Sequence, residues 1–346
     1  GGGVRGVIPS RILAELERAS GQPISSLFDL IVGTSIGGIA ALALTVPGPD
    51  GSPLYTPDSA AELLAGHKDV IFPGGELSVP RTVTEARELA STVTRTGFAV
   101  AGRHRDRGNA RYSAEPYEVA LSEFFGDTML SSALTPIVAT AFDVLTDQPT
   151  HLRSDDAAEI ADRDLPMATV ARAVTAAPTF LPPAEVEWGG RRTVLVDGGV
   201  FANGASLLAY TEARMHAAAR GRSPDRILLV SLGTGRHVGS PDYEVDDFSR
   251  RHWVGLANRL MKAAEAGQHE MHHRLLRDLL GDQYWRFQPK LPADEVFGTD
   301  DTSDEQMSAL SAIADQFVAE HRGKIGQLAE LLESEGQHHS MAVGTP

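Results

Sequence analysis

Apolar residues recur at helical spacing in several stretches of the chain. Near its start, Ile8, Ile12 and Leu16 fall on one helical face and Gly21 follows where a helix C-terminus is expected, so the pattern predicts a helix over residues 8–19. Similar spacing predicts further helices over residues 36–44, 117–125, 167–177, 206–220, 253–280 and 303–332.

Short, continuously apolar runs predict strands between these helices. They cover residues 27–32, 136–143, 193–196 and 226–231. Apolar runs without alternation are typical of strands covered on both faces, and strands that alternate with helices indicate a parallel sheet. The predicted fold class is therefore α/β, with a mainly parallel central sheet and helices on both of its faces.

A single domain is expected over residues 1–335. Prolines and paired glycines interrupt the pattern over residues 45–111, which predicts a variable insertion that could cover a site as a lid. Residues 240–335 are expected to form a helical C-terminal part, and residues 336–346, which lack periodicity, a disordered tail. Apolar residues of the insertion that could contact lipid, or pack in the core, are Val70, Ile71, Phe72 and Phe98.

Charge and cysteine content narrow the classes of partner. The 346 residues include 31 Lys and Arg against 46 Asp and Glu, and the resulting net charge of −15 would repel nucleic acid and gives no broad attraction to anionic membranes. The absence of cysteine excludes disulfides, a thiolate nucleophile and cysteine zinc sites, and it fits a cytoplasmic protein. No apolar run reaches about 18 residues, so no transmembrane segment is predicted.

The strongest local signal for chemistry is the run from Gly33 to Gly37, with the letters GTSIG. It follows a predicted strand and precedes a predicted helix, the context in which a G-x-S-x-G serine occupies a sharp turn with its hydroxyl exposed. Ser35 is therefore a candidate nucleophile, against the alternative of a structural glycine-rich turn. A serine hydroxyl needs a general base to take its proton before it can attack a carbonyl carbon.

Two histidines and one aspartate are candidates for that base. His216 and His237 follow Asp197 in the chain, which is the order in an ordinary α/β-hydrolase, although neither has a recognisable context. Asp197 ends a predicted strand and is followed by two glycines, and parallel sheets place their ligand sites at the carboxyl ends of strands. Asp197 could therefore act as the base directly, or it could be an ordinary turn residue.

A glycine-rich segment, Gly1 to Gly6 (GGGVRG), precedes the first predicted helix. Its amides, together with the helix N-terminus, could stabilise the negative charge that develops on a carbonyl oxygen during acyl transfer. The alternative is that these glycines are the remnant of a linker.

Taken together, these blocks resemble the patatin-like phospholipases, a family similar to the catalytic module of cytosolic phospholipase A2. The resemblance implies a patatin-like three-layer architecture and a catalytic dyad of Ser35 and Asp197 without a catalytic histidine. Gly2 and Gly3 would form the oxyanion hole, and Arg5 would lie near the substrate. The matching blocks, in family order, are GGGVRG at 1–6, GTSIG at 33–37, ARAVTAAPTFLPP at 171–183, DGGVFAN at 197–203 and VSLGTG at 230–235.

Two departures from the family pattern concern segments next to this dyad. Family members usually have a strand and an aspartate ahead of the glycines, which this sequence does not contain, so the anchoring of the glycine loop stays open. Where the family carries Asn-Asn-Pro, this chain has Asn203-Gly204-Ala205, which changes a helix start but no catalytic role.

The function that the resemblance implies is that of a lipid acyl hydrolase of the phospholipase A or lysophospholipase type. It would cleave carboxylic esters through an acyl-enzyme intermediate and would need no cofactor. Its partners would be a phospholipid or other acyl lipid and, transiently, a membrane or micelle surface, but not nucleic acid. Acyl transfer to an acceptor other than water and a non-catalytic effector module with the same fold are the alternatives.

A competing motif lies in the C-terminal part. The segment from His269 to His273 (HEMHH) contains H-E-x-x-H, which on a helix places two histidines on one face for zinc, with the glutamate as base. No third ligand with a recognisable spacing follows, and the segment fits a polar helix face equally well. No metal site is therefore predicted.

Overall fold

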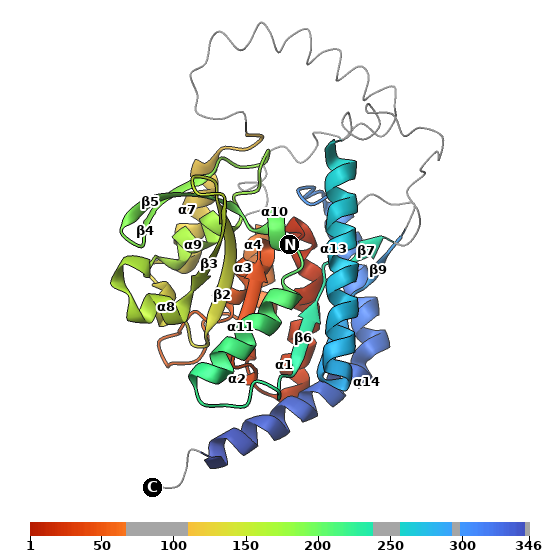
Figure 1. Ribbon diagram of the computed structural model, residues 1–346. Coiled ribbons are helices and arrows are strands. Elements are labelled where there is room, and N and C mark those ends of the chain that lie inside the picture. Colours follow the sequence, from red (N-terminus) through yellow and green to blue (C-terminus); the bar gives the residue numbers. More distant parts are fainter. Residues whose placement is uncertain (67–109, 238–256, 293–297, 343–346) are drawn as a thin grey trace, which may run out of the picture.

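The computed structural model describes residues 1–66, 110–237, 257–292 and 298–342 (Figure 1). Most of the predicted insertion, including Val70, Ile71, Phe72 and Phe98, lies outside the described residues. The role of the insertion as a lid therefore stays a prediction.

Five strands of the described chain form one sheet around β2. β1 (Ile31–Thr34) pairs in parallel with β2 (Ile137–Asp143). β2 also pairs antiparallel with β3 (Gln148–Arg153) and β5 (Arg191–Asp197), and β5 pairs with β4 (Ala184–Trp188). Two parallel pairs lie in the C-terminal part, β6 (Leu229–Leu232) with β8 (Tyr284–Phe287) and β7 (Arg236–His237) with β9 (Lys290–Leu291). The α/β fold class is thus confirmed.

Two antiparallel hairpins in this sheet were not predicted. β3 follows β2 after a turn in which Asp147 has a φ of +54°, and the hairpin of β4 and β5 turns at Gly189 and Gly190, with φ of +60° and +72°. Glycine tolerates these angles without steric cost, so a Gly-Gly pair between two polar, alternating runs is a hairpin signal. In this five-stranded sheet only the β1–β2 pair is parallel, and the pairs β2–β3, β2–β5 and β4–β5 are antiparallel, which differs from the mainly parallel pairing that was predicted.

Helices cover the sheet and bury two apolar clusters. Leu42, Val170 and Leu195 lie in the cluster around β2, and Ile8 and Leu310 in the cluster between the first and last helices. The helices predicted from the sequence are present as α1 (Val7–Ser20), α3 (Ile36–Ala43), α7 (Ala114–Phe125), α9 (Met167–Val174), α11 (Ser206–Ala219), α13 (Ala257–Leu280) and α14 (Asp304–Ala342). In Figure 1, α7, α8 and α9 lie on one side of the molecule and α13 and α14 on the other.

The remaining described elements are further helices, most of them short. They are η1 (Gly3–Gly6), α2 (Ile24–Leu27), α4 (Pro57–Gly66), η2 (Leu130–Ser132), α8 (Ser154–Glu159), η3 (Ala161–Arg163), α10 (Gly199–Ala202) and η4 (Gly281–Gln283). Because the turn of α2 takes up the chain after Pro23, β1 begins only at Ile31, later than the strand predicted over 27–32.

The last helix is longer than predicted. Leu310 and Ala314 of α14 are buried against α1, and the helix continues to Ala342. Once a helix is nucleated by packing, each further residue adds a backbone hydrogen bond at little cost. This corrects the expected disordered tail for residues 336–342, whereas 343–346 lie outside the described residues. Among the described helices, none is both long and apolar enough to cross a bilayer.

Candidate active site

Ser35 and Asp197 meet where two strands end against a third. β3 occupies one edge of β2, so β1 and β5 share the other edge. Thr34, the last residue of β1, lies opposite Thr140, and Asp197, the last residue of β5, lies opposite the next residue, Ala141. The two strands approach each other head-on along this edge. The residue that follows β1 is therefore brought beside the end of β5.

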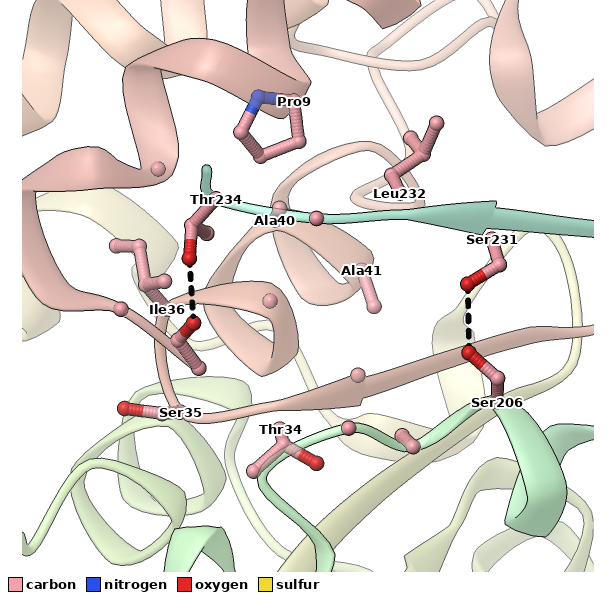
Figure 2. Close-up of a pocket in the computed structure, with 18 of the residues that line it drawn as sticks. Pro9, Thr34, Ser35, Ile36, Ala40, Ala41, Ser206, Ser231, Leu232 and Thr234 are labelled. Atoms are coloured by element: carbon pink, nitrogen blue, oxygen red, sulfur yellow. Dashed lines mark hydrogen bonds between the residues drawn. The ribbon is translucent and has the colours of Figure 1, made fainter. Parts of the chain in front are cut away.

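Ser35 occupies the turn between β1 and α3 (Figure 2). Its φ of +56° and ψ of −126° are rarely adopted by residues other than glycine. The turn is so tight that a Cβ on Gly33 would lie 2.1 Å from the carbonyl oxygen of Gly37, which explains the glycine at that position of the motif. The Ser35 carbonyl then accepts a hydrogen bond from the Gly38 amide at 2.8 Å. The serine thus stands at the end of the strand, ahead of the helix.

Asp197 is 5% exposed and faces this turn. Its Oδ1 accepts a hydrogen bond from the Gly199 amide at 2.7 Å, and hydrogen bonding from the Ser35 hydroxyl also acts on the pKa of this carboxyl. Burial raises the pKa of the carboxyl above its ordinary value, and the two hydrogen bonds oppose that rise. A carboxylate with a raised pKa is a stronger proton acceptor than an ordinary aspartate.

Thr34 connects the serine turn to the loop after Asp197. Its Oγ1 donates to the carbonyl oxygen of Ala202 at 2.8 Å and lies 2.8 Å from the Oγ1 of Thr140. Gly198 touches the same strand, since a Cβ there would lie 2.6 Å from the Thr140 carbonyl oxygen. The positions of Ser35 and Asp197 relative to each other are thus stabilised by contacts of the neighbouring residues Thr34 and Gly198.

The glycine loop lies against Ser35. A Cβ on Gly1 would be 3.5 Å from the Ser35 Cβ, and Thr234 Oγ1 donates to the Gly1 carbonyl oxygen at 2.9 Å. Gly2 and Gly3 have φ of +151° and +55°. Their amides donate to no acceptor in the part of the chain that the structure describes. With respect to the described residues, the two amides are therefore unpaired donors in a loop that borders the serine.

Arg5 is half-buried directly after this loop. Its Nε lies 3.5 Å from the carbonyl oxygen of Gly2. Burial lowers the pKa of its guanidinium, and the negative charge of Glu265 acts in the opposite direction. Arg5, Ser35 and Asp197 line the same large cavity. Arg5 therefore lies beside the Gly2 carbonyl, and its contact with a substrate stays a prediction.

The histidines considered as alternative bases are not seen at Ser35. His216 lies on α11, where its Nδ1 is 3.3 Å from a carboxylate oxygen of Asp155 and 2.8 Å from Arg220 Nη1. The side chain of His237 lies outside the described residues. Asp197 is thus the candidate base that the described structure pairs with Ser35.

The H-E-x-x-H segment lies on α13, as predicted. His269 packs against Gly204, where a Cβ would lie 2.5 Å from its Cδ2, and His273 Nδ1 is 3.4 Å from the Tyr284 hydroxyl. Burial lowers the pKa of His269 to about 4, so its imidazole is neutral near pH 7. Within the described ranges, no three His, Asp or Glu side chains are grouped so that they could share a metal ion.

Some contacts of the site had no signal in the sequence. Thr34 occupies a variable position of its motif, and Thr140 is an unremarkable residue of an apolar strand. The amide of Val4 donates to the carbonyl oxygen of Thr299 at 3.0 Å. A backbone acceptor places no requirement on the residue type, so such a contact cannot be found from the sequence.

Comparison with known proteins shows which family the sequence is similar to. A family model described as patatin-like phospholipase matches residues 1–209. The chain is 30% identical over 281 residues to Patatin-like protein 2 of Arabidopsis thaliana, covering 75% of this chain and 63% of that protein. It is 26% identical over 360 residues to Patatin-like protein 2 of Oryza sativa subsp. indica, covering 94% and 84%.

Among solved structures, VipD from Legionella pneumophila aligns over 95% of this chain and 65% of its own, with a TM-score of 0.33 and 10% identity. That likeness is too low to support a conclusion about fold or function. The family model, by contrast, covers more than half of the chain and includes both Ser35 and Asp197. The chain therefore belongs to the patatin-like phospholipase family.

Proposed function

We propose that the protein is a lipid acyl hydrolase in which Ser35 is the nucleophile and Asp197 its general base. The observation that carries this proposal is the meeting of β1 and β5 on one edge of β2, which puts the buried Asp197 beside the turn in which Ser35 has a positive φ. A serine held in this way has its proton acceptor within reach before the substrate arrives, which nucleophilic attack requires.

The reaction would proceed in two halves. Asp197 takes the hydroxyl proton as Ser35 Oγ attacks the ester carbonyl carbon, and the unpaired amides of Gly2 and Gly3 donate to the oxyanion. Collapse of this intermediate expels the alcohol, which receives the proton from Asp197, and leaves an acyl-enzyme. Water, deprotonated by the same carboxylate, then releases the fatty acid and restores the serine.

Apolar side chains beside the site support an acyl lipid of the phospholipase A or lysophospholipase type as substrate. Ile36 and Val200, which follow closely after the two catalytic residues in the chain, line the same cavity. Val200, three residues after Asp197 in the chain, is 39% exposed, so its apolar side chain is open to a ligand. Each methylene of an alkyl chain buried there contributes about 0.8 kcal/mol to binding. Such a substrate would be taken from a membrane or micelle surface by transient contact, and we place the reaction in the cytoplasm.

A fluorophosphonate probe tests the nucleophile directly, because the probe reacts only with an activated hydroxyl. We expect the wild type to be labelled at Ser35, as located by mass spectrometry, and to release fatty acid from phosphatidylcholine vesicles. Ser35→Ala should lose both properties. Ser206→Ala is the matched control, since Ser206 lines the same cavity but its hydroxyl bonds to Ser231 at 2.6 Å. Equal hydrolysis by wild type and Ser35→Ala would refute the proposal.

A further inference from the structure

A loop of the C-terminal part, residues 298–301, touches the glycine loop. The carbonyl oxygen of Thr299 accepts the Val4 amide at 3.0 Å, and a Cβ on Gly3 would lie 1.9 Å from the same oxygen. The Val4 amide is therefore occupied by the Thr299 carbonyl oxygen, while the amides of Gly2 and Gly3 have no acceptor among the described residues. The position of one carbonyl group thus decides which amides of the glycine loop are left to bind an oxyanion.

Gln306, near the start of α14, holds both ends of this loop. Its Nε2 donates to the carbonyl oxygens of Gly298 at 2.9 Å and Asp301 at 2.6 Å, and its Oε1 accepts the Gly298 amide at 2.8 Å. Gln306 is 6% exposed, so these hydrogen bonds are shielded from water. Shielded hydrogen bonds at both ends give the loop a fixed shape.

Asp300 fastens the middle of the loop to the segment that precedes α7. Its Oδ2 accepts hydrogen bonds from Arg111 Nη1 at 2.6 Å and from the Tyr112 hydroxyl at 2.8 Å. The backbone amides of Arg111 and Tyr112 donate in turn to the carbonyl oxygens of Thr179 and Phe180, each at 2.9 Å. Burial, together with Asp300, raises the pKa of Tyr112 to about 12, so its hydroxyl remains a donor at neutral pH.

We propose that Asp300 is a positioning residue for the reaction. Through the neighbouring Thr299 carbonyl, it holds the glycine loop in the orientation that turns the amides of Gly2 and Gly3 toward the carbonyl oxygen of the substrate. The proposal rests on the proposed hydrolase function. It extends the catalytic machinery to the C-terminal part, beyond the residues 1–209 that the family model matches.

The test compares Asp300→Ala with Asp301→Ala. Both remove one negative charge from the same loop, but among the described residues Asp301 Oδ1 accepts the local Ser303 amide alone, at 2.9 Å. We expect Asp300→Ala to lower kcat for p-nitrophenyl butyrate about 10- to 100-fold with KM within about twofold, because misplaced oxyanion donors weaken transition-state binding. Asp301→Ala should keep kcat within about twofold of wild type, and Tyr112→Phe, which removes one donor to Asp300, should lie in between.

Rates must be expressed per active site, counted by complete fluorophosphonate labelling. A merely structural role would lower the melting temperature and the active fraction but leave kcat per labelled site at the wild-type value, and that result would overturn the proposal. The pKa of the acid limb of kcat/KM should be the same in Asp300→Ala and wild type, since Asp197 is untouched. A shifted limb would also count against positioning.

Different results would refute the positioning role of Asp300 and the hydrolase function. If wild type turns over no faster than Ser35→Ala, the hydrolase function is wrong. If wild type is active and Asp300→Ala has full kcat per site, only the positioning role is wrong. Should Asp300→Ala not fold, Tyr112→Phe decides the same question, and an unchanged kcat in that variant would refute the role of Asp300.

Discussion

Replacing Asp197 by asparagine separates the chemistry of this residue from its contacts. Asparagine has the same size, and its side-chain oxygen can still accept the Gly199 amide that now lies 2.7 Å from Oδ1. The side chain loses its negative charge and with it the ability to take a proton from Ser35. The variant therefore tests the general base with little change in packing.

The expected effects on activity and stability are different. Loss of a general base costs about 10² to 10⁴ in kcat, equivalent to about 3 to 5.5 kcal/mol of transition-state stabilisation. Burial raises the pKa of Asp197 in the folded state above its value in the unfolded chain. The protonated carboxyl therefore contributes to the stability of the folded state below the unfolded pKa, and this contribution is lost as pH rises through the folded pKa. Near pH 7 the charge is therefore a cost to the folded state. We expect Asp197→Asn to be at least as stable as wild type at pH 7.

Asp143→Asn is the matched control for a buried aspartate. Asp143 is 0% exposed. Burial raises the pKa of its carboxyl, but hydrogen bonds from Arg191 and Thr146 lower that pKa by more, so the net shift is downward. A lowered folded-state pKa contributes stability above the unfolded pKa, and this stability is lost as pH falls through the folded pKa. Asp143→Asn should therefore be less stable than wild type at pH 7 and keep its kcat per labelled site.

The assays are p-nitrophenyl butyrate hydrolysis at pH 7 and urea unfolding at pH 7 and pH 4.5. The stability difference between Asp197→Asn and wild type should narrow at the lower pH, where the wild-type carboxyl gains its proton. A variant that retained about a tenth or more of the wild-type kcat would refute Asp197 as the general base. Marked destabilisation at pH 7 that grew at lower pH would refute the reasoning about burial.

Three further predictions concern pH, backbone strain and a buried ion pair. The kcat/KM profile should fall on acidification with a pKa above that of an ordinary aspartate, because Asp197 must be ionised to act as the base. A midpoint at or below the ordinary aspartate value would contradict the raised pKa of Asp197. Ser35→Gly should be about 1 kcal/mol more stable to urea than Ser35→Ala, since glycine relieves the φ of +56°, and equal stability would mean that the turn is unstrained. Burial opposes ionisation of Glu212, but His151 and Arg153 lower its pKa to about 2, so Glu212→Gln should lose about 1 to 2 kcal/mol at pH 7. That loss should shrink as pH falls below 4.5, and a loss independent of pH would contradict it.

The parts of the site that could be predicted from the sequence are those set by local rules. Ser35 was identified because an apolar run, two glycines and an apolar helix pattern follow one another within a short stretch. Asp197 was placed at a strand end, but the residues alone did not decide between it and the histidines, and the family resemblance was needed. The pairing of its carboxylate with Ser35 depends on strand neighbours and register, which hydrophobic periodicity does not report.

The remaining contacts of the site arise from tertiary structure. Thr140 is one polar residue in an apolar strand, and its position opposite Thr34 follows from the pairing of β1 with β2. The carbonyl of Thr299 contacts Val4 although the two lie in opposite parts of the sequence. Neither contact requires a particular motif. The long α14 shows the same limit, because its polar end stays helical by continuing a helix that is packed elsewhere.

The antiparallel pairing of β5, which the sequence did not predict, is what brings the candidate base to the serine. β1 and β5 pair with successive parts of one edge of β2, and because β1 is parallel and β5 antiparallel to β2, they run toward each other and end at Thr34 and Asp197. If β5 ran parallel to β1 on that edge, its first residue, Arg191, would lie next to the serine turn and Asp197 would lie at the far end of the strand. A slip of one residue in the β2–β5 register would turn the Asp197 side chain to the opposite face of the sheet. Direction and register of this one strand pair are therefore as necessary for the proposed chemistry as the two side chains themselves.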